Sequence, residues 1–229
     1  MKRKYTLLLT SVSLLAATYT QAQTAFFDFG RSDGENKSLI QAGTTGFEAP
    51  YNAVAGVNEL SVTSSSGITL TLYDDAAFIG RNRWNYSPTP GSDLTWDETF
   101  IDFIGGIDKI KVSGLAANTE YSFQFIAFDD DSSSSRTISF AETTGGANNA
   151  LGSVTYNAGD QVNSNSDFSV FSNLTSNASG DIYVDLTSSS GTPLLSGLII
   201  IPEPQTSALL IGSLTGLSAL AFRRKRTTN

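Results

Sequence analysis

The sequence predicts an all-β protein: an antiparallel two-sheet sandwich over residues 23–201, flanked by an N-terminal signal peptide and a C-terminal transmembrane helix. Three observations predict this arrangement. Apolar and polar residues alternate along short segments, and stretches rich in Ser, Thr, Asn, Asp and Gly separate those segments. At both ends of the chain, an apolar run lies beside a basic cluster.

The alternation is clearest in two segments, around residues 68–73 and 181–186. Ile68, Leu70 and Leu72 alternate with Thr and Tyr in the first, and three apolar residues alternate with Asp and Tyr in the second. Each segment is therefore predicted to be a strand with one buried face and one solvent-exposed face. Eight further strands are predicted, at residues 26–29, 59–63, 107–112, 121–128, 137–141, 152–156, 168–171 and 194–201. Ten short strands without a convincing helix favour a sandwich in one domain.

The composition excludes several kinds of chemistry. The 229 residues include no His and no Cys, so a Ser-His-Asp triad, a thiol nucleophile, a Cys/His zinc site and disulfides are all excluded. Residues 23–201 hold seven basic and 21 acidic residues, a net charge of −14. A body this acidic repels phosphate backbones, so we expect no nucleic-acid partner.

The N-terminal residues 1–22 have the features of a signal peptide. Three basic residues precede an apolar run over residues 5–17, and small residues at Thr20 and Ala22 suit cleavage after Ala22. The run is shorter than the roughly 20 residues that a membrane span needs. An uncleaved anchor and a buried helix are the alternatives.

The C-terminal residues 202–229 combine three parts. Pro202, Glu203 and Pro204 come first, and the uncharged stretch 207–222 follows them. The third part is a basic cluster: Arg223, Arg224, Lys225 and Arg226. As a helix the stretch would span roughly 24 Å, a marginal membrane anchor whose basic end is held in the cytoplasm. A buried helix and a glycolipid-anchor signal are the alternatives.

These three parts, in this order, resemble the PEP-CTERM sorting signal of Gram-negative bacteria that make exopolysaccharide. The resemblance implies a transient anchor in the inner membrane, recognition by an exosortase-type membrane protease, and release to the cell surface or extracellular matrix. Pro202, Glu203 and Pro204 would form a substrate motif, which the two prolines keep extended. The mature protein would then lack the basic cluster.

A second resemblance covers most of the body. Its pieces are short motifs at residues 27–30, 102–104, 112–115, 121–125 and 196–198, with Arg81 and Arg83 before the second piece. In this order they look like the galactose-binding-like jelly rolls of secreted bacterial proteins and of polysaccharide-degrading enzymes. A local rival exists, because residues 115–121 also resemble the tyrosine corner of a fibronectin type III sandwich.

An aromatic segment between Pro- and Gly-containing turns is the candidate ligand site. Flat rings can stack on the C–H faces of sugars while neighbouring polar groups bind hydroxyls. This predicts polysaccharide binding by five residues: Arg81, Arg83, Trp84, Tyr86 and Trp96. The alternative is that the tryptophans cap the core and the arginines pair with acidic residues.

Adjacent carboxylates suggest calcium only weakly. Asp129, Asp130 and Asp131 could supply oxygen ligands, but the spacing of a calcium loop is missing. We therefore favour a solvated acidic turn here, and the same for Asp74 and Asp75. No cofactor is expected.

Three hypotheses of function follow. The first is a non-enzymatic surface or matrix protein that binds carbohydrate or exopolysaccharide, and the second is a structural or adhesive matrix component without a ligand site. The third is a polysaccharide-active enzyme, which two carboxylates could support without His or Cys. Because no catalytic motif is present, we expect the protein not to be an enzyme.

Overall fold

The computed structural model describes residues 24–32, 43–49, 58–74, 77–82, 99, 102–129, 135–157 and 159–203. The predicted signal peptide, the predicted helix at residues 207–222 and the basic cluster lie outside these ranges. Within these ranges, no helix combines the length and the apolar character that crossing a membrane requires.

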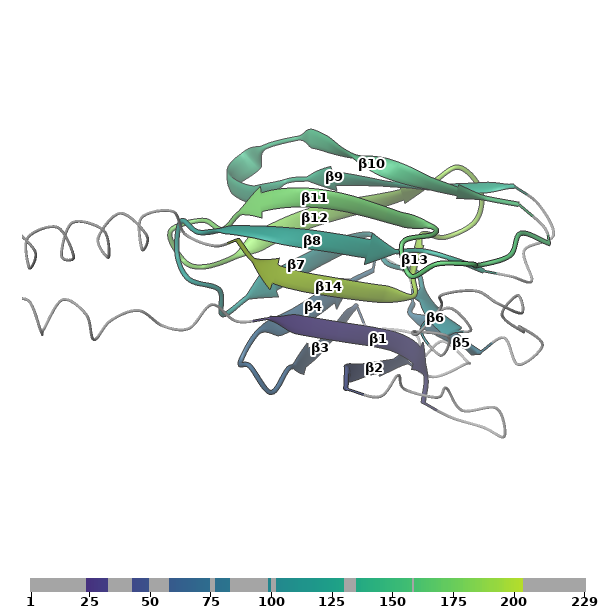
Figure 1. Ribbon diagram of the computed structural model, residues 1–229, viewed down its shortest axis with the longest axis horizontal. Coiled ribbons are helices and arrows are strands. Elements are labelled where there is room, and N and C mark those ends of the chain that lie inside the picture. The colour runs from purple at the N-terminus through teal and green to yellow at the C-terminus, as the bar shows by residue number, and fades with distance from the viewer. Residues whose placement is uncertain are drawn as a thin grey trace, which may run out of the picture.

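Two large sheets form the sandwich (Figure 1). The five-stranded sheet has the order β11-β8-β14-β1-β2. Its strands are β1 (Ala25–Arg31), β2 (Thr45–Ala49), β8 (Glu120–Ile126), β11 (Ser169–Thr175) and β14 (Gly197–Pro202). Neighbouring strands are antiparallel except β1 and β2, which run parallel.

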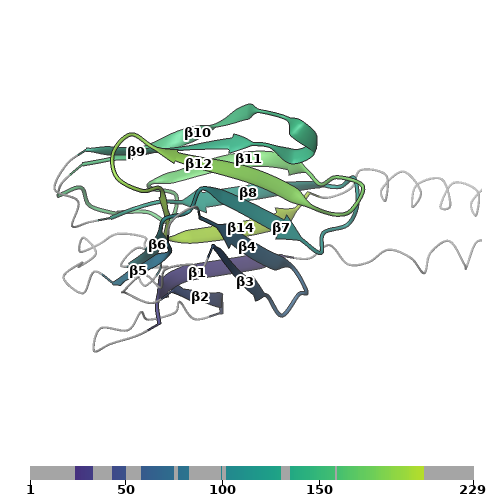
Figure 2. The ribbon, with the colours of Figure 1, turned by 180° about the vertical axis from the view of Figure 1, so that it is seen from behind.

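The six-stranded sheet has the order β10-β9-β12-β7-β4-β3 and is antiparallel throughout (Figure 2). Its strands are β3 (Glu59–Thr63), β4 (Thr69–Tyr73), β7 (Lys109–Ser113), β9 (Arg136–Glu142), β10 (Asn149–Tyr156) and β12 (Ile182–Ser188). A small third sheet joins β13 (Leu194–Leu195), β6 (Asp102–Gly105) and β5 (Ile79–Asn82). A short 3-10 turn, η2 (Thr144–Gly146), precedes β10.

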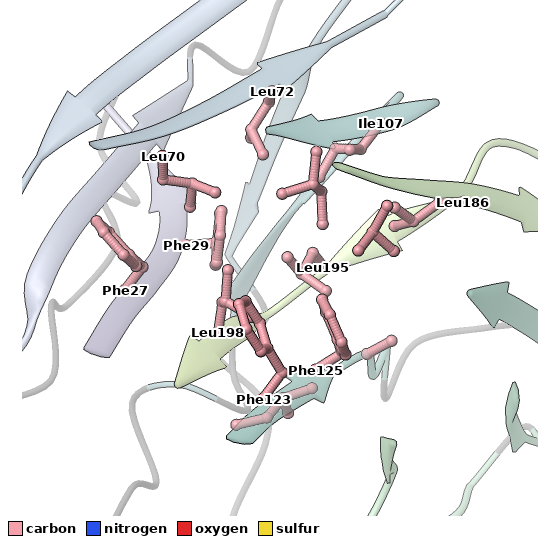
Figure 3. Packing of buried hydrophobic residues seen from close by; sticks show 14 of the residues in the cluster. Phe27, Phe29, Leu70, Leu72, Ile107, Phe123, Phe125, Leu186, Leu195 and Leu198 are labelled. Carbon is pink, nitrogen blue, oxygen red and sulfur yellow. The ribbon is translucent and has the colours of Figure 1, made fainter. Parts of the chain in front are cut away.

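The core lies between the two large sheets, where their apolar faces meet (Figure 3). Phe27 and Phe29 of β1 and Leu70 and Leu72 of β4 are 0% exposed. Phe125 of β8 stacks on rings from both sheets, among them Phe140 at a centroid distance of 5.0 Å. The predicted all-β sandwich is therefore confirmed, and its architecture agrees with a jelly-roll-like fold.

All ten predicted strands are present, but the structure adds others. The predicted strand 194–201 is two strands, β13 and β14, divided at Ser196. The hydroxyl of Ser196 donates to the Phe128 carbonyl and accepts from its N–H, which fixes the division. β2, β5 and β6 were not predicted. β6 is buried at every position, so it shows no alternation, and β5 contains Gly80, where a Cβ would lie 2.8 Å from the Gly30 carbonyl oxygen.

The tyrosine corner is also present, inside the larger sandwich. The Ala116 N–H donates to the hydroxyl of Tyr121 at 2.9 Å, and the Tyr121 side chain is buried. The local resemblance to a fibronectin type III sandwich therefore holds for this hydrogen bond. The five-stranded sheet also contains β11 and β14. One sandwich therefore includes the C-terminal part of the body, which a domain of fibronectin type III size would not contain.

The first and last strands of the body are antiparallel neighbours. Ala25 of β1 lies opposite Ile200 of β14, so the chain enters and leaves at the same end of the sandwich (Figure 1). Pro202 is the last residue of β14, and the Glu203 N–H donates to the Glu120 carbonyl at 3.2 Å. The hydroxyl of Ser122 also donates to the Glu203 carboxylate. The first two residues of the predicted sorting motif are therefore held extended against β8.

Candidate functional site

The candidate site is a groove of about 560 Å³ on the outer face of the six-stranded sheet. Its lining comes from the adjacent strands β4, β7 and β12 and from residues that flank them, near the end of the sandwich where β4 stops and β7 begins. Figure 2 shows the course of these three strands. Its lining comprises eight residues: Tyr73, Asp74, Asp108, Lys109, Tyr183, Asp185, Leu186 and Thr187. We call this the tyrosine groove.

Strand alternation places most of this lining on one face. In β12 the residues Ile182, Val184 and Leu186 are buried, so Tyr183 and Asp185 face away from the core. Register then aligns the strands, because Lys109 of β7 lies opposite both Tyr73 and Asp185. The two tyrosines therefore come from strands that β7 separates.

The backbone of Asp108, directly before β7, is hydrogen-bonded to both β4 and β12. Its N–H donates to the Tyr73 carbonyl at 2.9 Å, and its carbonyl accepts from the Leu186 N–H at 2.8 Å. Its side chain is exposed. Asp74 packs beside Gly106, where a Cβ would lie 2.8 Å from Oδ2 of Asp74 and 2.6 Å from the Ala77 carbonyl oxygen. The positive φ of +86° at Gly106 likewise favours glycine, which keeps this wall close-packed.

Ion pairs position the side chains around Tyr183. Lys111 Nζ lies 3.3 Å from Oδ2 of Asp181 and 5.6 Å from the centre of the Tyr183 ring. The Tyr183 hydroxyl donates to the same Asp181 oxygen at 3.4 Å. Tyr183 is thus held on one side by a cation and at its tip by a carboxylate, so its ring is oriented without a ligand.

A second ion pair lies inside the groove. Lys109 Nζ is 3.5 Å from Oδ1 of Asp185, which also accepts from the Thr143 hydroxyl at 3.2 Å. Both side chains of this pair are more than one-third exposed, so water screens the attraction and the pair contributes little stability. These groups remain accessible to a ligand.

Two pKa shifts reflect this environment. Burial raises the pKa of the Tyr73 phenol above its ordinary value, and the negative charge of Glu59 raises it further. Burial opposes the charged form of Lys111, but the hydrogen bond and the charge of Asp181 outweigh it and raise the lysine pKa. At neutral pH the tyrosine is therefore a neutral hydrogen-bonding ring and Lys111 is a cation.

Hydroxyl groups also lie farther along this outer face, on β3 and β4. Cross-strand hydroxyl pairs join Ser61 with Thr71 at 2.7 Å and Thr63 with Thr69 at 2.8 Å. Together with two phenol rings, carboxylates and an ammonium, they form a surface that can stack on flat apolar faces and exchange hydrogen bonds with many hydroxyl groups.

Of the five predicted ligand-binding residues, the structure describes one. Arg81 lies in β5, opposite Phe103 of β6, and is half-buried. Arg83, Trp84, Tyr86 and Trp96 lie outside the described residues. The aromatic segment stays a prediction.

The predicted acidic turns are wrong at the two positions that the structure describes. Asp129 is 4% exposed and Asp74 is 7% exposed, whereas we expected solvated carboxylates. Both follow strands closely and are covered by neighbouring segments, which local sequence does not reveal. Asp130, Asp131 and Asp75 are outside the described residues. Within the described part of the chain, no group of three or more acidic residues has the geometry to hold a metal ion.

Sequence reasoning did not single out the tyrosine groove. The alternation already placed Tyr73 and Tyr183 on wet faces of their strands. What it lacked was the order of strands, which puts β4 and β12 on either side of β7 although more than 100 residues separate the two tyrosines in the chain.

Comparison with known proteins gives distant structural matches only. No family model matches the chain, and no curated protein matches it. Among solved structures, β-glucuronidase 2 of Bacteroides uniformis matches at 14% identity and a TM-score of 0.36, over 70% of this chain and 20% of that one. Exo-β-1,3-galactanase of Phanerochaete chrysosporium matches at 16% identity and a TM-score of 0.26, over 72% of this chain and 32% of that one.

These matches correct one expectation. We expected a protein that is not an enzyme, and the matched structures are glycoside hydrolases, which contradicts that expectation. It rested on missing sequence motifs, and glycosidase carboxylates from distant strands leave no such motif. This chain spans at most about a third of the length of the matched proteins.

Proposed function

We propose that this protein is exported, held briefly in the inner membrane by its C-terminal segment, and released to the cell surface or matrix, where its sandwich binds carbohydrate in the tyrosine groove. The observation that carries the binding proposal is the groove itself. Two phenol rings on one sheet face, in a groove that is also lined by charged and hydroxyl side chains, match a sugar chain that offers C–H faces and hydroxyls.

The geometry of the two ends supports the membrane part of the proposal. β1 begins and β14 ends side by side, so a segment that follows Glu203 into a membrane would hold that end of the sandwich toward the bilayer. The tyrosine groove lies toward the opposite end, where β4 ends at Tyr73 and β7 begins at Lys109. The groove would then face away from the membrane.

The binding proposal is tested with a panel of immobilised polysaccharides and three variants. Tyr183→Ala and Tyr73→Ala should each weaken retention about tenfold or more, the loss expected for a stacked ring with its hydrogen bond. Phe171→Ala is the matched control, because Phe171 is an aromatic residue, 60% exposed, on the other large sheet. Retention should not change in the control, and the melting temperature should stay close to that of the parent in all three.

Three results would contradict the binding proposal or redirect it. Retention that is unaffected by both tyrosine substitutions would remove the groove as the site. If Trp84→Ala then abolished retention without loss of melting temperature, the aromatic segment would be the site instead. No retention on any polysaccharide would favour a structural matrix component. The same panel is assayed for newly released reducing ends, which would assign glycoside hydrolysis.

The sorting proposal has its own measurement. We expect protein shed by its native host to have an intact mass that excludes Arg223, Arg224, Lys225 and Arg226. Replacing Pro202, Glu203 and Pro204 with alanine should leave the chain in the membrane fraction. A shed protein that retains the basic cluster, or a full-length chain dissolved in the cytosol, would refute this part of the proposal.

A further inference from the structure

The tyrosine groove contains more acidic than basic side chains. Its lining includes three carboxylates, on Asp74, Asp108 and Asp185, and one ammonium, on Lys109, for a formal charge of −2. The ammonium is already paired with Asp185. The sequence around it adds to the imbalance, because residues 23–201 carry a net charge of −14. The field at the groove is therefore negative.

The accessible carboxylates in the groove are those of Asp108 and Asp185. Asp108 is exposed, and the Asp185 side chain is 38% exposed. Asp74, by contrast, is packed against Gly106 and is 7% exposed. A ligand can thus reach two carboxylate groups, one directly before β7 and one in the neighbouring strand β12, in a groove that Tyr73 and Tyr183 also line.

The tyrosines, like the carboxylates, favour a ligand that carries positive charge. Phenol rings attract cations to their faces, and the ammonium of Lys111 already lies 5.6 Å from the centre of the Tyr183 ring. A carboxylated or sulfated sugar chain would meet both the carboxylates and the negative faces of the rings. Repulsion from the accessible carboxylates and from the ring faces would oppose its binding.

Building on the proposed function, we propose that the carbohydrate bound in the tyrosine groove carries protonated amino groups, as a polymer of unacetylated amino sugars does. Its ammonium groups pair with the carboxylates of Asp108 and Asp185, and its ring faces stack on Tyr73 and Tyr183. The inference rests on charge complementarity and on the accessibility of the two carboxylates.

The test compares two ligands that share a sugar backbone, of which only one carries positive charges. Glucosamine and N-acetylglucosamine oligomers of equal length share a backbone, and acetylation removes the positive charges. With the full-length chain in mild detergent, calorimetric titration should show the glucosamine oligomer binding about tenfold more tightly, as expected for one charge-assisted hydrogen bond. The difference should shrink as salt is added, because salt screens charge pairs. An oligogalacturonate of the same length should bind most weakly.

Two variants and one control locate the effect. Asp108→Asn and Asp185→Asn should each reduce the preference for the glucosamine oligomer severalfold, because each weakens binding of the charged oligomer more than binding of the acetylated one. Glu120→Gln removes the same charge at an exposed position on β8, where the chain leaves the sandwich, and should change neither affinity. Melting temperatures of all three variants report whether the fold is intact.

The outcomes separate this inference from the proposed function. Equal affinities for the two oligomers, or a preference that Glu120→Gln reduces as much as Asp108→Asn does, would overturn the amino-sugar inference. If binding were still lost in Tyr183→Ala, carbohydrate binding in the groove would stand. Failure of every oligomer and every polysaccharide to bind would instead overturn the proposed function, and the inference with it.

Discussion

The outer faces of the two large sheets differ in how well strand alternation describes them. On the six-stranded sheet, the outward residues Tyr183 and Asp185 are partly exposed, as alternation predicts. On the five-stranded sheet, Asp28 alternates with the core residues Phe27 and Phe29 and should be wet, yet it is 0% exposed. Ile199, which lies outside the core cluster, is 7% exposed.

A covering segment explains the buried positions on the five-stranded sheet. A Cβ placed on Gly197 would lie 2.7 Å from Cγ2 of Thr99, so this residue lies directly on the sheet surface beside Asp28, the cross-strand partner of Gly197. Farther along the same sheet, Phe171 is 60% exposed and Ile201 is 50% exposed. Alternation therefore determines which side of a sheet a residue faces, whereas the remaining chain determines whether that side meets water.

The largest expected effect contrasts two apolar residues on this one face. Ile199→Ala should lower the free energy of unfolding by about 2–4 kcal/mol, because it removes buried methylene and methyl groups from a central strand. Phe171→Ala should change it by less than about 0.5 kcal/mol, because the ring is already in water. Chemical denaturation of both variants measures the contrast. Equal losses would show that this face is uniformly covered.

Two carboxylates sharpen the comparison between the sheets. Asp28→Ala should cost about 1–3 kcal/mol of stability, because it removes a fully buried side chain together with the interaction that this side chain makes. Asp185→Ala should cost less than about 1 kcal/mol, since its ion pair with Lys109 is exposed. Urea titrations at neutral pH compare the two. A larger loss for Asp185→Ala would reverse the assignment of covered and open faces.

Hydroxyl pairs on the six-stranded sheet allow a finer comparison within one face. Thr71→Val breaks the hydrogen bond with Ser61 at a position only 5% exposed and should cost about 1 kcal/mol. Thr69→Val breaks an equivalent pair with Thr63 that is exposed to water, and should have an effect near zero. Both substitutions keep the β-branched shape, so thermal unfolding reports the hydrogen bond. Similar costs would mean that burial does not control these pairs.

The smallest expected effect is a loss of stability at alkaline pH. The folded protein raises the pKa of Lys111 and of Tyr73, so it holds both protons more tightly than the unfolded chain does. Their contribution is present below the ordinary values of 10.5 and 10.0 and is lost as pH rises through the folded-state values. Lys111→Met should flatten the alkaline part of a plot of unfolding free energy against pH. A profile identical to the parent's would contradict the assigned interaction with Asp181.

Most of the strands that the sequence predicted have one solvent-exposed face, although β14 is buried from Gly197 to Ile200. Predicted strand 59–63 coincides with β3, and the wet and buried residues of β12 fall where alternation placed them. β6 escaped prediction because both of its faces are covered and its four residues are all buried. The tyrosine corner could be recognised because its hydrogen bond joins residues only five apart, Ala116 and Tyr121.

The candidate site was less predictable than the fold. Tyr73, Lys109 and Tyr183 show nothing unusual in the sequence beyond their place on wet strand faces. They become one groove through the pairing of β7 with β4 on one side and with β12 on the other. The aromatic segment with Trp84 and Trp96 could be predicted as a ligand site because its residues lie close together in the sequence.

The sequence by itself determined the class of fold, the faces of most strands and the acidic character of the body, because these depend on short-range alternation and on composition. It also carries the terminal motifs from which export is proposed, which are contiguous. Only the tertiary structure decided the order of the strands, the burial of Asp28, Asp74 and Asp129, and the meeting of Tyr73 with Tyr183. The physical reason is that pairing between strands far apart in the chain, and coverage by other segments, leave no local pattern to read.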